Sequence, residues 1–442
     1  FVSYREIGND ELFGVLKDME LANLVRGKSS REILLITGIY AREENAGDSE
    51  VIRDAPQQLL VEVLAKELEK NYSFGTTTKE VVYVLERQGF IRPHMADEND
   101  KRTIYMVDMH EPLMFLHNLE TTIKEPFASN PAVLDAIEKN HRKLQMAMTK
   151  LYPGNLVISL SSGVMHHRLV DRITALNDVP REPLVPRRLG KNMCVPFGKI
   201  LRGKVVPNTV TKTLHTDKVY EPDLNSFTIE PFPYYSPLKS QIETIKSFDR
   251  PVILVDDLVH KADRLQVLVP QLRENGIPIK KVVVGVLSGY GRDLMQCLKV
   301  PVESIYSMPN LRQWFVESTL YPFIGGDTVR REEMKVAGLQ PSINMILPYA
   351  TPRLSGCSRE ALVEFSACCI ENSRDLFQVL EAEYRKMYAK NLTLSRLSEA
   401  VILPLCPDKG SCMEYDENLA ASVYLENDLE TLWRMKEFLI KG

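Results

Sequence analysis

The chain has 442 residues, of which 44% are hydrophobic and 26% are charged. Single hydrophobic cores stop growing at roughly 250–300 residues, so this length predicts more than one domain. No apolar run approaches the ~18 residues that a membrane-spanning helix needs. The formal net charge of -4 argues against a protein that binds nucleic acid over much of its surface.

The cysteines predict a reducing environment. There are seven, an odd number, and they form neither a CxxC pair nor a metal-ligand spacing with histidine. We therefore expect reduced thiols and a cytoplasmic location. The sequence begins with Phe1, and residues 1–10 lack the apolar core of a secretory signal. We interpret the chain as a fragment or processed product that follows a further domain.

Residues 1–110 alternate short apolar runs with helical patterns, which predicts an N-terminal α/β module. A strand is expected at residues 33–39 and helices at residues 59–68 and 81–85. Two alternatives remain open for this part. Residues 33–91 could belong to an acyltransferase-like fold, and residues 79–108 could form a winged-helix DNA-binding regulator with residues 100–106 as its wing.

Residues 111–150 predict a helical connector. Its apolar face carries Leu134, Ile137, His141 and Leu144, and Pro153-Gly154 ends the helix.

A second α/β module is predicted at residues 151–325. Residues 156–160 form a short apolar run, and Ser161-Ser162-Gly163 turns the chain into a helix. The same order recurs later: a strand at residues 252–255, a helix, and a third apolar run at residues 282–287. This strand-helix-strand unit implies parallel strands with a right-handed crossover.

Residues 326–442 predict a mostly helical C-terminal region. Residues 358–390 form a long amphipathic pattern, and Asp428 is placed to cap a last helix that carries Leu432 and Trp433.

Two adjacent acids, Asp256 and Asp257, follow the strand at residues 252–255. The carboxyl ends of strands in open α/β sheets face the ligand crevice. Neighbouring carboxylates repel one another, so a cation or the hydroxyls of a ligand are expected beside them. The loop from Val259 to Arg264 then opens a helix, whose N-terminus favours an anion. Together these features predict a small-molecule partner, a sugar phosphate.

The stretch VILVDDLVHKADR, residues 252–264, resembles the signature of type I phosphoribosyltransferases, which bind 5-phosphoribosyl diphosphate and Mg²⁺. The resemblance implies that Asp256 and Asp257 hold the ribose hydroxyls as the catalytic pair, and that they bind Mg²⁺ indirectly or through the substrate. It also implies that the loop wraps the 5-phosphate with His260, Lys261, Ala262, Asp263 and Arg264.

The phosphate loop departs from that family's pattern of small residues with a Thr-Gly step. Lys261 and Arg264 could hold phosphate by charge. Ala262 allows less backbone freedom than glycine, and Asp263 would repel an anion. A phosphoribosyltransferase fold that has lost catalysis, and serves as a sensor or assembly module, is therefore an alternative.

The diphosphate needs backbone N–H groups and cations. Ser161, Ser162 and Gly163 are candidates for the first role because they start a helix. Residues 187–218 read as an irregular basic segment, similar to the mobile loop of the family, although a solvated basic surface is the alternative. Its cations are Arg187, Arg188, Lys191, Lys199, Arg202, Lys204, Lys212 and Lys218, with one acid, Asp217. Arg202, Lys204 and Lys212 are the expected substrate ligands.

The wider chain resembles bacterial multidomain proteins in which a phosphoribosyltransferase-like module follows a cytidylyltransferase-like module. Residues 123–131 (IKEPFASNP) and 208–212 (NTVTK) carry this likeness together with the acidic pair. The HxGH motif of a cytidylyltransferase is not in the sequence, so that module is expected upstream of Phe1. The resemblance also implies transfer of the phosphoribosyl group to an acceptor. We count a homodimer among the expected partners.

Overall fold

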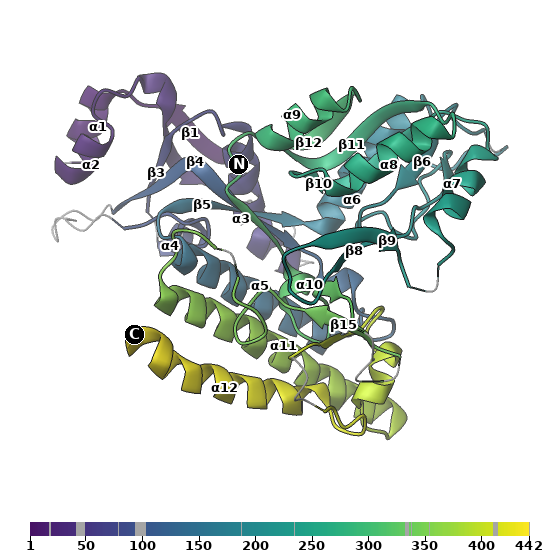
Figure 1. Ribbon diagram of the computed structural model, residues 1–442. Helices are drawn as coiled ribbons and strands as arrows, with labels where there is room; N and C mark the ends of the chain where they lie inside the picture. The colour runs from purple at the N-terminus through teal and green to yellow at the C-terminus, as the bar shows by residue number, and fades with distance from the viewer. Residues whose placement is uncertain are drawn as a thin grey trace.

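The computed structural model describes residues 1–16, 19–40, 49–77, 79–92, 103–186, 188–233, 235–331, 336, 338–352, 354–409 and 414–441. These residues form three β-sheets and a layer of long helices (Figure 1). We call the sheets the N-terminal sheet, the parallel sheet and the small sheet. The predicted α/β fold, with a parallel sheet and a helical C-terminal region, is confirmed.

The N-terminal sheet has the order β1-β2-β3-β4-β13, and β5 also pairs with β4. Its strands are β1 (Val2–Glu6), β2 (Ile33–Ile39), β3 (Tyr72–Thr76), β4 (Ile104–His117), β5 (Asn155–Ser161) and β13 (Gln313–Val316). The helices of this part are α1 (Asn9–Leu16), α2 (Met19–Leu24), α3 (Ser49–Lys66), α4 (Lys79–Arg87) and the short η1 (Ser30–Glu32). The strand predicted at residues 33–39 is confirmed. Helix α4 packs against α5. The wing predicted at residues 100–106 lies partly outside the described residues.

Strand β4 changes partners along its length. Ile104 to Asp108 pair antiparallel with β3, whereas Leu113 to Leu116 lie between β5 and β13, both parallel to β4. The prediction of a helical connector from residue 111 is therefore wrong for residues 111–117. A strand that is buried on both faces reads as a continuous apolar run, which periodicity does not separate from a buried helix.

The parallel sheet has the order β12-β11-β10-β6-β7, and all its strands run parallel. Its elements are α6 (Ser162–Leu176), β6 (Met193–Pro196), β7 (Val210–Thr211), α7 (Leu238–Lys246), β10 (Val252–Val259), α8 (Asp263–Glu274), β11 (Ile279–Ser288), α9 (Gly289–Cys297) and β12 (Val302–Met308). The predicted strand-helix-strand unit is confirmed as β10-α8-β11.

The small sheet has the order β16-β15-β14-β8-β9. Its strands are β8 (Thr216–Tyr220), β9 (Phe227–Pro231), β14 (Asp327–Val329), β15 (Gln340–Ile343) and β16 (Leu405–Pro407). The basic segment at residues 187–218 was expected to be irregular, and most of its described residues are, although it also contains β6, β7 and the start of β8. The apolar runs of these strands are only two to four residues long, so the surrounding lysines and arginines mask them.

The long helices α5 (Pro131–Leu151), α11 (Arg359–Tyr388) and α12 (Ala421–Lys441) lie side by side (Figure 1). The short helices η2 (Leu119–Thr121) and η3 (Leu394–Glu399) join them to the sheets, and α10 (Glu317–Leu320) lies between β13 and β14. Ser358 caps α11 by accepting the backbone N–H of Ala361 at 3.1 Å. The cap predicted for the last helix is wrong: α12 begins at Ala421, and Asp428 lies inside it, buried against Lys409.

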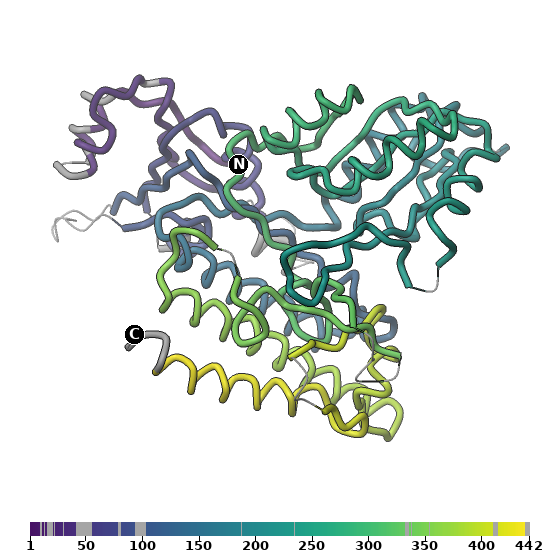
Figure 2. The backbone as a smooth tube through the Cα atoms, in the orientation of Figure 1, coloured from purple at the N-terminus to yellow at the C-terminus, as the bar shows by residue number. Residues whose placement is uncertain are grey.

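The parallel sheet is inserted into the N-terminal sheet. The chain leaves β5 through α6, forms the parallel sheet, and returns after β12 to add β13 beside β4 (Figure 2). One hydrophobic cluster contains Leu156 and Ile158 of β5 together with Ile253 and Val255 of β10. The two sheets therefore share a core, and the domain boundaries at residues 110, 150 and 325 remain predictions. No helix among the described residues is both long and apolar enough to cross a bilayer.

Candidate functional site

The two acids lie within β10, not after it, because the strand continues to Val259. Strand β6 pairs with β10 only as far as Val255, opposite Pro196. Asp256 and Asp257 therefore lie just beyond the end of β6, where the chain turns at Phe197. This position is at the carboxyl edge of the parallel sheet, which is where open α/β sheets bind ligands.

Asp257 holds the turn that follows β6. Its carboxylate accepts the backbone N–H groups of Lys199 at 2.7 Å and of Ile200 at 2.9 Å. Gly198 is needed for this approach, because a Cβ atom there would lie 2.5 Å from Asp257 Oδ1 and 2.7 Å from Asp256 Oδ1. Both carboxylate oxygens of Asp257 already have protein partners, so Asp257 is an anchor for the turn.

Asp256 is in a different electrostatic state. Its carboxyl is half-buried, and the loss of hydration raises its pKa, against the opposing charge of Arg264. Its Oδ1 accepts the backbone N–H of Asp257 at 2.9 Å. Of the two acids, Asp256 is the one with a carboxylate oxygen that can meet a ligand hydroxyl.

The phosphate loop joins β10 to α8. His260 Nδ1 lies 2.8 Å from Ser288 Oγ, and Lys261 is exposed. Ala262 adopts a left-handed conformation, with φ 54° and ψ 23°, which glycine adopts at less cost. In the described part of the chain no side chain caps α8, and its first helical hydrogen bond runs from Gln266 N to Ala262 O. The N–H groups of its first turn are therefore directed at the loop.

Asp263, which was expected to repel an anion, forms an ion pair. Its Oδ2 lies 3.1 Å from Lys218 Nζ, which β8 contributes. Burial by itself would lower the pKa of Lys218, but the interactions with Tyr220 and Asp263 are stronger, so the pKa of Lys218 is raised. The repulsion expected from Asp263 is therefore largely neutralised by an ion pair that the sequence did not predict.

Two arginines bring cations to the same edge. Arg264 Nη1 donates to the carbonyl of Phe197 at 2.7 Å. The guanidinium carbon of Arg202 lies 5.1 Å from the ring centre of Phe232, and its buried Nε and Nη2 have no hydrogen-bond partner among the described residues. Burial lowers the pKa of Arg202, with Asp217 opposing. A guanidinium can form two parallel N–H bonds to a carboxylate or phosphate, and the Nε and Nη2 atoms of Arg202 are available for them.

The small sheet covers this edge with further charged groups that sequence reasoning did not assign to the site. Asp217 of β8 accepts the hydroxyl of Thr328 at 2.6 Å. Burial raises the pKa of Asp327 of β14, against the charges of Lys199 and Lys218. The only sequence signal for Asp327 was its place after the flexible Gly325-Gly326 step.

The remaining predicted ligands lie on β5, on α6 and in the chain before and after β7. Ser161 ends β5 in the N-terminal sheet, and its Oγ accepts the N–H of Gly163 at 3.2 Å, so it caps α6. Ser162 is buried in the first turn of α6. Lys204 and Lys212 are exposed, and their charges act on His166 and His215 respectively. Arg187 lies outside the described residues.

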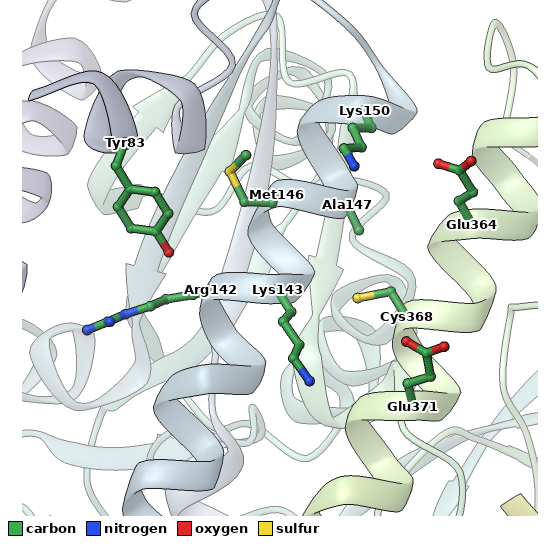
Figure 3. A pocket seen from close by; sticks show the side chains of 9 residues that line it. All are labelled: Tyr83, Arg142, Lys143, Met146, Ala147, Lys150, Glu364, Cys368 and Glu371. Carbon is green, nitrogen blue, oxygen red and sulfur yellow. The ribbon is translucent and has the colours of Figure 1, made fainter. Parts of the chain in front are cut away.

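Two cavities in the described part of the chain lie away from the acidic pair. The larger, about 400 Å³, opens between α5 and α11, and Figure 3 shows its lining side chains, among them Arg142, Lys143, Glu364 and Cys368. The other, about 310 Å³, lies between α3 and β12 and is lined by Glu62, Arg168 and Tyr306. The candidate site is therefore described by its polar groups.

Comparisons with known proteins give weak likenesses. No family model matches the chain, and no curated protein matches it. Among solved structures, a purine phosphoribosyltransferase from Pyrococcus horikoshii Ot3 is 12% identical, with a TM-score of 0.22, over 35% of this chain and 87% of that chain. The AQ2163 protein from Aquifex aeolicus is 14% identical, with a TM-score of 0.21, over 42% and 85%. Likenesses this weak do not indicate a function for this chain.

Proposed function

We propose that the carboxyl edge of the parallel sheet binds 5-phosphoribosyl diphosphate with Mg²⁺, and that the protein transfers the phosphoribosyl group to an acceptor. One observation carries this proposal: β10 and the turn after β6 bring Asp256, the uncapped N-terminus of α8 and the unsatisfied guanidinium of Arg202 to one edge. Hydroxyls, a phosphate and a diphosphate are the ligand groups that these three features accept.

Each of these groups contacts a different part of the ligand. Asp256 accepts hydrogen bonds from the ribose hydroxyls, while Asp257 keeps the turn in place. The first-turn N–H groups of α8 and the exposed Lys261 hold the 5-phosphate. Arg202 takes the diphosphate in bidentate fashion. The Lys218–Asp263 ion pair lowers the repulsion that the phosphate would otherwise meet.

The reaction needs no nucleophile from the chain. The acceptor forms a bond to the anomeric carbon as the bond from that carbon to the diphosphate oxygen breaks, and the diphosphate leaves with the electron pair. Arg202 stabilises the charge that develops on the leaving group. Carboxylate and phosphate oxygens are the ligands that Mg²⁺ prefers, so Asp256 and the substrate fit this ion, which neutralises diphosphate charge when bound.

Calorimetry with 5-phosphoribosyl diphosphate, with and without Mg²⁺, tests the binding step. We expect binding to the parent that depends on Mg²⁺, and a large loss of affinity in Asp256→Asn and in Arg202→Met. Asp293→Asn, an exposed acid on α9, is the matched control and should bind as the parent does. A parent that takes up no ligand at millimolar concentration, or an Asp256→Asn variant that binds equally well, would contradict the proposal.

The second candidate is a sensor or assembly module without catalysis. It is favoured by the left-handed Ala262, because glycine would adopt this conformation of the phosphate loop at less cost. Release of diphosphate in the presence of candidate acceptor bases separates the two. Binding without diphosphate release would support the sensor.

A further inference from the structure

A second polar cluster lies at the carboxyl edge of β4, β5 and β13. His117 is the last residue of β4, Glu317 follows β13, and His141 lies in the middle of α5. Their side chains are 13%, 0% and 12% exposed, respectively. Strands that are parallel neighbours bring their carboxyl ends to the same edge, so the fold joins three residues that are far apart in the sequence.

The donor atoms of this cluster converge. His141 Nε2 lies 2.6 Å from Glu317 Oε2, and His117 Nδ1 lies 3.8 Å from the same oxygen. The two imidazole rings are 4.2 Å apart between centroids, and the three donor atoms lie within 4.8 Å of one another. In a tetrahedral zinc site with bonds near 2.0–2.1 Å the ligand atoms are about 3.3 Å apart, which falls inside this range of distances.

Outer hydrogen bonds fix the orientation of the donors. The Nε2 atom of His117 is bonded to the Ser159 hydroxyl, which turns Nδ1 towards Glu317. The Tyr321 hydroxyl donates to Glu317 Oε1 at 3.1 Å and leaves Oε2 to the histidines. Partners of this kind orient the ligands of metal sites and raise their affinity.

The two strand ends are also tied to each other. Asn118 Nδ2 donates to Ser318 Oγ at 2.8 Å, and Ser318 N donates to Asn118 Oδ1 at 2.9 Å. These residues directly follow His117 and Glu317, so the reciprocal bonds set the distance between the two candidate ligands. The arrangement is thus built before any ion binds.

We propose that His117, His141 and Glu317 bind one divalent transition-metal ion of the zinc class. Two ring nitrogens and one carboxylate oxygen that converge within 4.8 Å of one another form the ligand set of a single cation, which accepts a lone pair from each. Two imidazoles and a carboxylate are ligands for Zn²⁺, whereas Mg²⁺ prefers oxygen alone. This site is therefore distinct from the proposed Mg²⁺-dependent sugar-phosphate site. Three protein donors leave a fourth position for water.

The test is Zn²⁺ titration of the full, metal-stripped chain in competition with a chromophoric chelator. We expect one ion per chain, and roughly a hundredfold weaker binding or worse in His141→Gln, since even the loss of an outer partner costs 10–100-fold. The Zn²⁺ affinity of Ser159→Ala should lie between that of His141→Gln and that of the parent. His167→Gln is the matched control, because His167 is exposed on α6, and it should bind as the parent does.

Spectroscopy on the parent keeps the proposal falsifiable if a variant does not fold. X-ray absorption of the Zn²⁺ form should show nitrogen and oxygen ligands and no sulfur, and Co²⁺ should give the visible absorption of a four-coordinate site. A parent that binds no Zn²⁺, sulfur in the first shell, or unchanged binding in a folded His141→Gln would overturn the proposal. Binding of the sugar phosphate is measured separately and does not enter this test.

Discussion

Asp256 and Asp257, adjacent acids on one strand, have different surroundings. Asp257 accepts two backbone N–H groups, so its charge is satisfied by the turn after β6. The pKa of Asp256 is raised because burial removes water from its carboxyl group. Sequence reasoning treated the two as an equivalent pair, since their identity and spacing carry no information on which backbone groups face them.

The pKa shift of Asp256 sets the sign of a stability effect. The folded protein holds a proton on Asp256 up to a higher pH than the unfolded chain does, so this residue costs stability as the pH rises from about 4 through its folded pKa. We expect Asp256→Asn to be more stable than the parent at about pH 8 and the difference to vanish towards about pH 4. Urea unfolding at several pH values measures this.

Asp257→Asn is the contrasting variant. An amide offers one acceptor oxygen and places an NH₂ group against a backbone N–H, so about 1–3 kcal/mol of unfolding free energy should be lost. A destabilised Asp256→Asn, or an unaffected Asp257→Asn, would show that the roles are assigned to the wrong acids.

At the scale of elements, the long amphipathic patterns predicted α11 well, because Leu362 to Tyr384 repeat on one face over many turns. The small sheet was not predicted. Strands such as β14 and β16 have only three residues each, and their partners lie far away in the sequence. The candidate metal ligands were missed for the same reason: His141 reads as a helix-face residue until β4 and β13 are placed beside α5.

Helix α12 is fixed by a buried charge. Asp428 accepts the Tyr349 hydroxyl and pairs with Lys409, and these charged side chains are 5% and 13% exposed. We expect Asp428→Ala to cost about 3–5 kcal/mol of unfolding free energy, because it leaves the Lys409 charge buried without its partner. Denaturant unfolding measures the loss. Glu430→Ala, an exposed acid of the same helix, serves as control and should cost under about 0.5 kcal/mol.

At the scale of the whole molecule, the insertion of the parallel sheet between β5 and β13 joins parts that the sequence presented as successive modules. A hydrophobic cluster that contains Phe115 and Phe315 of the N-terminal sheet also contains Val363 of α11 and Leu432 of α12. Composition and periodicity report local structure and do not reveal which modules share a core.

The chain has two tryptophans, Trp314 in β13 and Trp433 in α12, which report on these two parts. Because the parts share one cluster, Trp314→Phe and Trp433→Phe should each show a fluorescence transition at the same denaturant midpoint. Circular dichroism of both variants controls for the substitutions. Midpoints that differ would mean that the helical layer unfolds by itself.

Helix α6 runs from the edge that carries His117 to the edge that carries Asp257. It begins directly after Ser161, which is opposite His117 in the β4–β5 pairing. One turn later Met165 reaches the parallel sheet, where a Cβ atom on Gly285 would lie 2.1 Å from its sulfur and 2.6 Å from the carbonyl oxygen of Asp257. Helix α6 therefore contacts both edges. If a metal ion at the first edge alters the affinity for a sugar phosphate at the second, thermodynamic reciprocity requires the sugar phosphate to alter the affinity for the metal by the same factor.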